Sequence, residues 1–149
     1  MTAVSVLTFF GIILAFRIMF ANGYSHGVPQ KVCDTLIPGH RHTEGQTSPS
    51  PYVVNVDKTS IGQGDTVEVV VKSIHDQNVF KGFLAVARST DLNDTIPWGM
   101  FSSEDPELAR VQDCLGYFNS SATHVSNDSK TEATLQWTAP ARDGYYKIL

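Results

Sequence analysis

Residues 66–74 read TVEVVVKSI, and this stretch decides the fold class. Val67, Val69 and Val71 alternate with mainly polar residues, so one side of an extended chain is apolar and the other is solvated. Side chains of a β-strand point alternately to its two faces. The pattern therefore predicts a strand with one buried face.

Further strands are expected on both sides of this stretch. Residues 52–57 (YVVNVD) precede it, and residues 79–88 (VFKGFLAVAR) follow after a break at 75–78. The second of these is apolar on both faces, which predicts a central strand covered on both sides. Residues 131–137 (TEATLQW) alternate again, with the inward positions occupied by Ala133, Leu135 and Trp137.

The remaining segments give weaker patterns. A short strand is expected at Phe101, another at residues 123–125, and a brief helical turn at residues 107–114. Several short strands joined by turns, without an amphipathic helix, predict an antiparallel β-sandwich. A last strand starts at Tyr145 and the chain stops at Leu149, which indicates a truncated strand, although five residues lie within the normal range of strand lengths.

The first residues are expected to be a leader rather than part of the fold. An apolar run from Ala3 is interrupted by Arg17, and small residues at Ala21 and Gly23 fit a signal-peptidase site before Tyr24. Residues 1–23 are therefore predicted to be a signal peptide and residues 24–149 one domain. The alternative is an uncleaved signal anchor, because residues 3–21 approach the length of a membrane span.

Two features downstream agree with export. Three sequons place N-glycosylation at Asn93, Asn119 and Asn127. The two cysteines, Cys33 and Cys114, are expected to form a disulfide in an oxidising compartment rather than to remain free thiols. Together these features predict a secreted glycoprotein.

Composition and motifs exclude several functions. The net charge is −4 and no basic run occurs, so nucleic acid is not an expected partner. Neither a nucleophile elbow nor a phosphate-binding glycine loop occurs, so the chain is expected not to be an enzyme and to carry no cofactor. His26, His40, His42 and Glu44 match no closed zinc pattern and are expected to be surface residues.

Trp98 and Phe101 form the candidate binding surface, because exposed aromatic side chains on the loops of a rigid sandwich commonly bind partners. We favour the other interpretation, in which both aromatic side chains pack as a lid over one end of the sandwich. For Gly82 we favour relief of local crowding or a bulge, and for Arg88 a structural contact with an acidic group or with loop carbonyls.

The order of several short motifs is similar to that of reeler domains. These motifs are GYSHGVP at 23–29, Cys33, IPGH at 37–40, SPSPY at 48–52, GDTV at 64–67, FKGFLAVAR at 80–88, Cys114, Thr123 with His124, Lys130, WTAP at 137–140 and Gly144. The resemblance implies an immunoglobulin-like sandwich in which Cys33 pairs with Cys114. The chain departs from the family at its end, where the last strand normally continues.

The resemblance also suggests functions. Reeler domains occur in small secreted defence proteins of insect type, at the N-terminus of ferric-chelate reductase-like membrane proteins, and in matrix proteins. We expect a secreted recognition module that binds an extracellular ligand, such as a microbial surface component or another protein, or that self-associates through its loops and exposed strand edges. The alternative is the N-terminal extracellular part of a reductase-like membrane protein, whose DOMON and haem-bearing cytochrome b561 parts are absent from this sequence. Contact with a membrane is expected only in that case or if the leader stays uncleaved.

Overall fold

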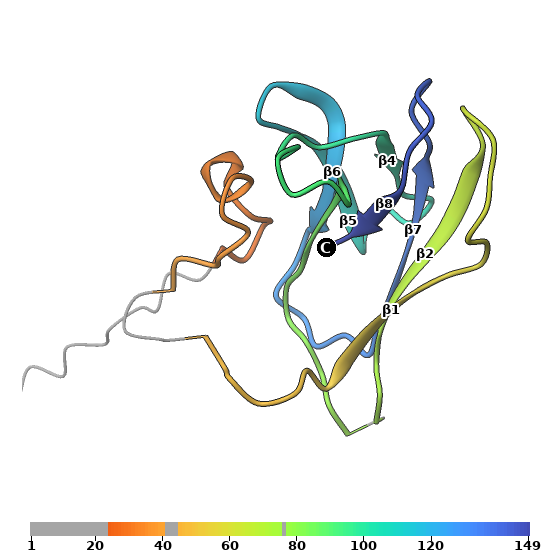
Figure 1. The fold of residues 1–149 in the computed structure, drawn as a ribbon. Helices are drawn as coiled ribbons and strands as arrows, with labels where there is room; N and C mark the ends of the chain where they lie inside the picture. The colour runs from red at the N-terminus through yellow and green to blue at the C-terminus, as the bar shows by residue number, and fades with distance from the viewer. Residues whose placement is uncertain (1–23, 41–44, 76) are drawn as a thin grey trace, which may run out of the picture.

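Two four-stranded antiparallel sheets face each other in the computed structural model, which describes residues 24–40, 45–75 and 77–149 (Figure 1). One sheet has the order β1-β2-β7-β4 and the other β5-β6-β3-β8. The predicted all-β fold with one disulfide is confirmed. The predicted leader, His42 and Glu44 lie outside the described residues. The elements are the short 3₁₀ helix η1 (Gln30–Val32) and the strands β1 (Tyr52–Val56), β2 (Thr66–Ser73), β3 (Leu84–Ser89), β4 (Met100–Ser102), β5 (Ala109–Cys114), β6 (Tyr117–His124), β7 (Glu132–Thr138) and β8 (Tyr146–Ile148).

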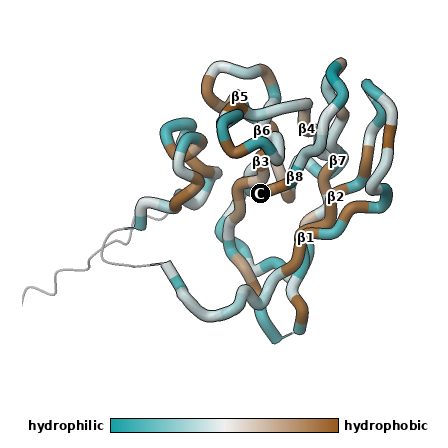
Figure 2. Tube along the Cα trace, viewed as in Figure 1, coloured by the Kyte–Doolittle hydropathy of each residue, from teal (hydrophilic) through white to brown (hydrophobic). Residues whose placement is uncertain are grey.

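The core lies between the sheets and combines large residues of one sheet with small residues of the other. Strand β2 pairs with β7 so that Val69 lies opposite Leu135, and both side chains are almost fully buried. The facing strands β3 and β6 contribute Ala85 and Ala122. Because alanine leaves space for the larger residues across the interface, the two inner faces interdigitate. Figure 2 shows the hydrophobic segments along β1, β2 and β3.

Strand β3 is buried on both faces, as its sequence predicts. Ala85 and Ala87 face the core, whereas Val86 faces the other way and is fully buried with Cys33 and Cys114. The outer face of β3 is thus covered by the N-terminal segment rather than by a third sheet.

Two predicted elements differ from the structure. The strand expected at residues 79–88 begins at Leu84, because the backbone N–H of Phe83 donates to the His124 side chain and Phe80 forms only an isolated bridge with Lys130. The helical turn expected at 107–114 is wrong, since this region contains β5. The Asp105 carboxylate accepts N–H groups as a helix cap would, but pairing with β6 continues the chain as a strand.

The strand expected at 123–125 is the end of the longer strand β6.

Among the described residues, no helix is long and apolar enough to cross a membrane.

Candidate functional site

A disulfide joins the N-terminal segment to the second sheet. Cys33 and Cys114 are bonded, with their Cα atoms 5.5 Å apart and both side chains fully buried against Val86. The predicted pairing is therefore confirmed. The cross-link connects the end of η1 to the end of β5 and holds the segment over the outer face of β3.

Arg88 and His124 reinforce this attachment with hydrogen bonds to backbone carbonyls. The Arg88 Nη2 donates to the carbonyl oxygens of Cys33 at 2.7 Å and Asp34 at 2.9 Å, which confirms the expected contact with loop carbonyls. The His124 Nδ1 accepts the Phe83 N–H at 3.0 Å, so Nε2 carries the proton that bonds the Tyr24 carbonyl at 2.8 Å.

Gly82 allows the His124 ring to lie against the chain. A Cβ atom at position 82 would lie 2.6 Å from Cε1 of that ring. Gly82 therefore leaves room for the His124 ring, as the expected relief of crowding requires. Because this ring is hydrogen-bonded to the Tyr24 carbonyl, the glycine contributes to packing of the N-terminal segment.

Of the two predicted binding aromatics, only Trp98 is partly exposed. Phe101 is 2% exposed in β4 and lies opposite Trp137 on the inner face of the sheet, so its assignment to a binding surface is wrong. Trp98 lies in the loop before β4 and is half-buried. Strand alternation at 100–102 puts Phe101 inward, because its neighbours Met100 and Ser102 point to solvent.

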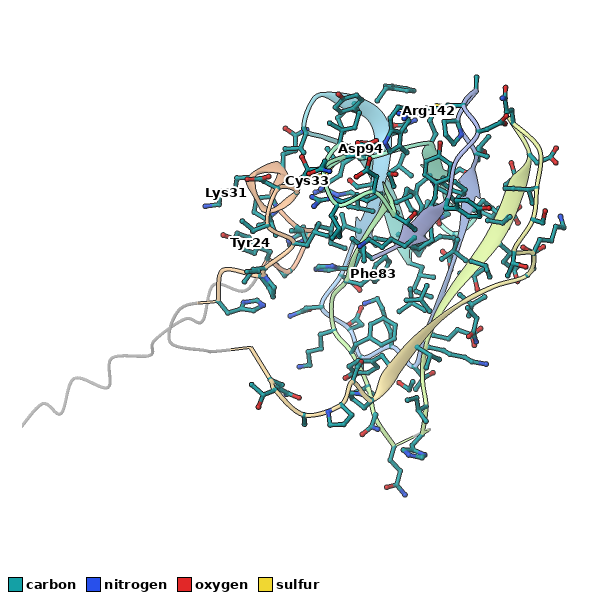
Figure 3. All side chains as sticks on the ribbon, viewed as in Figure 1. Tyr24, Lys31, Cys33, Phe83, Asp94 and Arg142 are labelled. Carbon is teal, nitrogen blue, oxygen red and sulfur yellow. A yellow bond between two sulfur atoms is a disulfide. The ribbon has the colours of Figure 1, made fainter. Side chains whose placement is uncertain are left out.

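Trp98 belongs to a cluster with two charged residues at one end of the sandwich. Its Nε1 donates to Oδ2 of Asp94 at 2.9 Å, and Arg142 forms an ion pair with the same oxygen at 3.5 Å. The Arg142 guanidinium also lies 4.5 Å from the centroid of the Trp98 ring, in a cation–π arrangement. Arg142 and Asp94 are labelled in Figure 3.

Tyr146 connects this cluster to the core. Its ring lies 6.3 Å from that of Trp98 and 5.7 Å from that of Trp137, and its hydroxyl donates to the Arg142 carbonyl at 3.0 Å. The pKa of the Tyr146 phenol is raised, mainly because the group is partly buried. The positive charge of Arg142 lowers this pKa, whereas the negative charges of Asp94 and Asp143 raise it. The phenol is therefore neutral and donates a hydrogen bond at physiological pH.

Beside the cluster, a groove of about 520 Å³ opens between the two sheets. Val67 and Trp137 form part of its lining, and both are nearly buried core residues. Tyr145, 84% exposed, lies at its rim. The apolar and aromatic lining consists of Val56, Ile61, Val67, Trp137, Ala139, Pro140, Tyr145, Tyr146 and Ile148, and the charged residues are Lys58, Arg142 and Asp143. The groove can hold an apolar group while its rim contacts a polar or charged one.

A second hollow, of about 280 Å³, is acidic. Its lining includes the carboxylates of Glu68, Glu104, Asp105 and Glu132. No group of three or more metal-ligating side chains suited to a metal ion occurs in residues 24–40, 45–75 and 77–149.

The three sequons differ in their surroundings. Asn93 and Asn127 are exposed, whereas Asn119 is half-buried in β6 with a φ of 46°. Ser121, the hydroxyl residue of the second sequon, is fully buried and donates to the Gln112 carbonyl at 2.9 Å. Glycosylation at all three positions stays a prediction.

The sequence signals for this site were incomplete. Trp98 is noticeable as an aromatic residue in a polar loop, but Arg142 and Tyr146 lie more than forty residues away in sequence. A β-sandwich brings such distant segments together through strand order, which local periodicity does not report.

A disulfide-tethered N-terminal segment on a two-sheet sandwich is the architecture that the sequence resemblance implies. The family model described as "Reeler domain" matches residues 31–148, and the chain belongs to this family. The crystal structure of the human F-spondin reeler domain has the same fold, with a TM-score of 0.56 and 18% identity, covering 66% of this chain and 72% of that one.

Two kinds of relatives share about a third of their aligned residues with this chain. A "Putative defense protein" of Bombyx mori is 33% identical over 119 residues, which are 78% of this chain and 67% of the relative. "Ferric-chelate reductase 1" of Homo sapiens is 31% identical over 139 residues, which are 93% of this chain and 22% of that protein. The chain thus spans only about a fifth of the ferric-chelate reductase relatives.

Proposed function

We propose that this reeler domain is a secreted, non-catalytic recognition module, and that its groove binds amphiphilic microbial surface components such as lipopolysaccharide. The observation that carries the proposal is the groove itself, whose lining is largely apolar and also contains the charged residues Arg142, Lys58 and Asp143. The predicted leader, the three sequons and the relative named as a defense protein support an extracellular role in defence.

The chemistry of the groove suits an acylated anionic ligand. Its apolar lining would bury an acyl chain at about 25 cal/mol per Å² of apolar surface removed from water. The Arg142 guanidinium would bind a phosphate at the rim, since its planar array of donors matches phosphate oxygens. Arg142 is already held in place by Asp94 and the Trp98 ring, so little side-chain entropy would be lost on binding.

Replacing Arg142 with glutamine is expected to weaken binding of purified lipopolysaccharide by ~tenfold, as loss of one charge-assisted hydrogen bond implies. Titration calorimetry with the glycosylated protein measures this affinity. The control is Lys31→Gln, which removes the same charge at an exposed position far from Arg142 (Figure 3). Equal affinities for both variants, or no binding by the unaltered protein, would refute the proposal.

A second candidate function is the N-terminal extracellular domain of a ferric-chelate reductase-like membrane protein. The alignment to the human protein covers 93% of this chain but 22% of that protein, so it is as compatible with this candidate as it is with a defence protein. Sequencing the transcript beyond the codon for Leu149 tests this candidate. Coding sequence for a DOMON-like domain and several membrane spans would support it, and a stop codon would exclude it.

A further inference from the structure

The sequon at Asn119 lies in a central strand of its sheet. Strand β6 is paired on both sides, because the strand order is β5-β6-β3-β8. Ser121, the hydroxyl residue of this sequon, pairs with Gln112 of β5 and with Val86 of β3. Acceptor sequons are normally found in surface loops, where an enzyme can reach both the asparagine and the hydroxyl residue. The position of Asn119 is therefore unusual for an acceptor.

Side-chain contacts also close this sequon in the folded domain. The Ser121 side chain is fully buried, and its hydroxyl donates to the Gln112 carbonyl at 2.9 Å. The backbone N–H of Asn119 donates to Oδ1 of Asp113, also at 2.9 Å. Ser120, between the two sequon residues, is 1% exposed. The folded hairpin of β5 and β6 thus withholds the hydroxyl and the backbone that a glycosylating enzyme has to bind.

The other two sequons remain open in the folded domain. Asn93 and Asn127 are exposed, and so are their hydroxyl residues, Thr95 and Ser129. Both sequons belong to loops, one between β3 and β4 and the other between β6 and β7. An enzyme can reach them without separating β6 from its neighbours, so they serve as internal references for the closed sequon.

The closed sequon becomes inaccessible once the domain has folded. Its exposure requires separation of β6 from both β5 and β3, and core strands open with a free energy close to that of global unfolding. Global unfolding exposes roughly one molecule in a thousand or fewer. An isolated two-stranded hairpin is in contrast only marginally stable, so the sequon stays accessible until the hairpin is fixed to the rest of the domain.

The disulfide fixes the hairpin close to this sequon. Cys114 is the last residue of β5 and pairs with Tyr117, two positions before the acceptor asparagine. Its bond to Cys33 attaches this end of the hairpin to the N-terminal segment, against Val86 of β3. A hairpin forms in microseconds, but a disulfide takes seconds to hours. Oxidation is therefore slow enough to compete with attachment of a glycan.

We propose that Asn119 accepts a glycan only until the Cys33–Cys114 bond closes the β5–β6 hairpin, an inference that rests on the export included in the proposed function. Asn119 Nδ2 forms a bond to the anomeric carbon of a lipid-pyrophosphate-linked oligosaccharide and loses one proton. The bond from that carbon to the pyrophosphate oxygen breaks, and the lipid pyrophosphate leaves. Oxidation limits the glycosylated fraction at Asn119 but not at the two loop sequons.

Site occupancy in secreting cells tests this competition. The full chain is expressed with and without a membrane-permeant reductant during synthesis, and peptides from cells and medium together are quantified by mass spectrometry. Without the reductant, Asn119 is expected to be partly glycosylated. The reductant should lower the unglycosylated fraction at Asn119 several-fold and leave the fractions at Asn93 and Asn127 unchanged.

Two variants separate oxidation from other effects of the reductant. The double variant Cys33→Ser with Cys114→Ser should give high occupancy at Asn119 with or without the reductant, because no cross-link forms. The control is Gly99→Ala, which keeps both cysteines but places a Cβ atom against the Thr138 carbonyl oxygen and so destabilises the fold. This control should respond to the reductant as the unaltered protein does.

Several outcomes would overturn the proposal. One is complete occupancy at Asn119 in the unaltered protein without the reductant. Others are an occupancy that the reductant and the double variant leave unchanged, or a rise in Gly99→Ala equal to that in the double variant. Glycans absent from all three positions would overturn it together with the proposed export. The other three results leave export and lipopolysaccharide binding unaffected, and the Arg142 variant tests that binding separately.

Discussion

Replacing both Cys33 and Cys114 with serine is expected to lower the free energy of unfolding by about 4 kcal/mol. The two cysteines are 81 residues apart, so their cross-link removes a large amount of conformational entropy from the unfolded chain. Both sulfur atoms are also fully buried against Val86, where two hydroxyl groups would lack the apolar contacts of the disulfide. Equilibrium denaturation in urea measures the change.

The double variant is preferred to single ones because it leaves no free thiol. Arg88→Lys in the disulfide-bonded protein is the control for the hydrogen bonds of the same segment, and it should cost much less because the cross-link persists. Proteolysis should then cut near residues 34–40 in the double variant but not in the control. An unchanged urea midpoint for the double serine variant would contradict the role assigned to the cross-link.

The parts of the fold that follow alternation could be predicted from the sequence. Strands β2 and β7 each bury one face, and this gives them a clear two-residue period with Val69 and Leu135 inward. The central position of β3 followed from its two apolar faces. For these strands local pattern and tertiary environment agree, which is the condition under which sequence patterns are informative.

The parts that depend on distant contacts could not be predicted. β6 reads YFNSSATH and buries polar residues such as Ser121 and Thr123 against backbone carbonyls, so hydropathy does not reveal it. The local sequence at Asp105 favours a helical turn, but pairing with β6 outweighs it. The cluster of Trp98 with Arg142 likewise depends on strand order.

Replacing Gly99 with alanine is expected to lower the free energy of unfolding by about 3 kcal/mol. Two effects contribute: an alanine is strained in the left-handed backbone conformation of this position, and its Cβ atom clashes with neighbouring atoms. Gly99 has a φ of +70°, and a Cβ atom there would collide with the Thr138 carbonyl oxygen and lie 2.6 Å from Nε1 of Trp137. That nitrogen donates to the Trp98 carbonyl at 3.0 Å, so the clash would also disturb the link between the candidate site and the core.

Gly64→Ala separates the two contributions. Gly64 has a similar φ of +77°, but nothing lies within 4 Å of a Cβ atom built there. This variant should therefore lose only about 1 kcal/mol, the cost of the left-handed conformation. Urea denaturation of both variants, with tryptophan fluorescence as the probe, measures the difference. Equal losses of stability in the two variants would contradict the close packing of Gly99 against Trp137. They would also contradict the inference that this packing supports Trp98 through the hydrogen bond from Trp137.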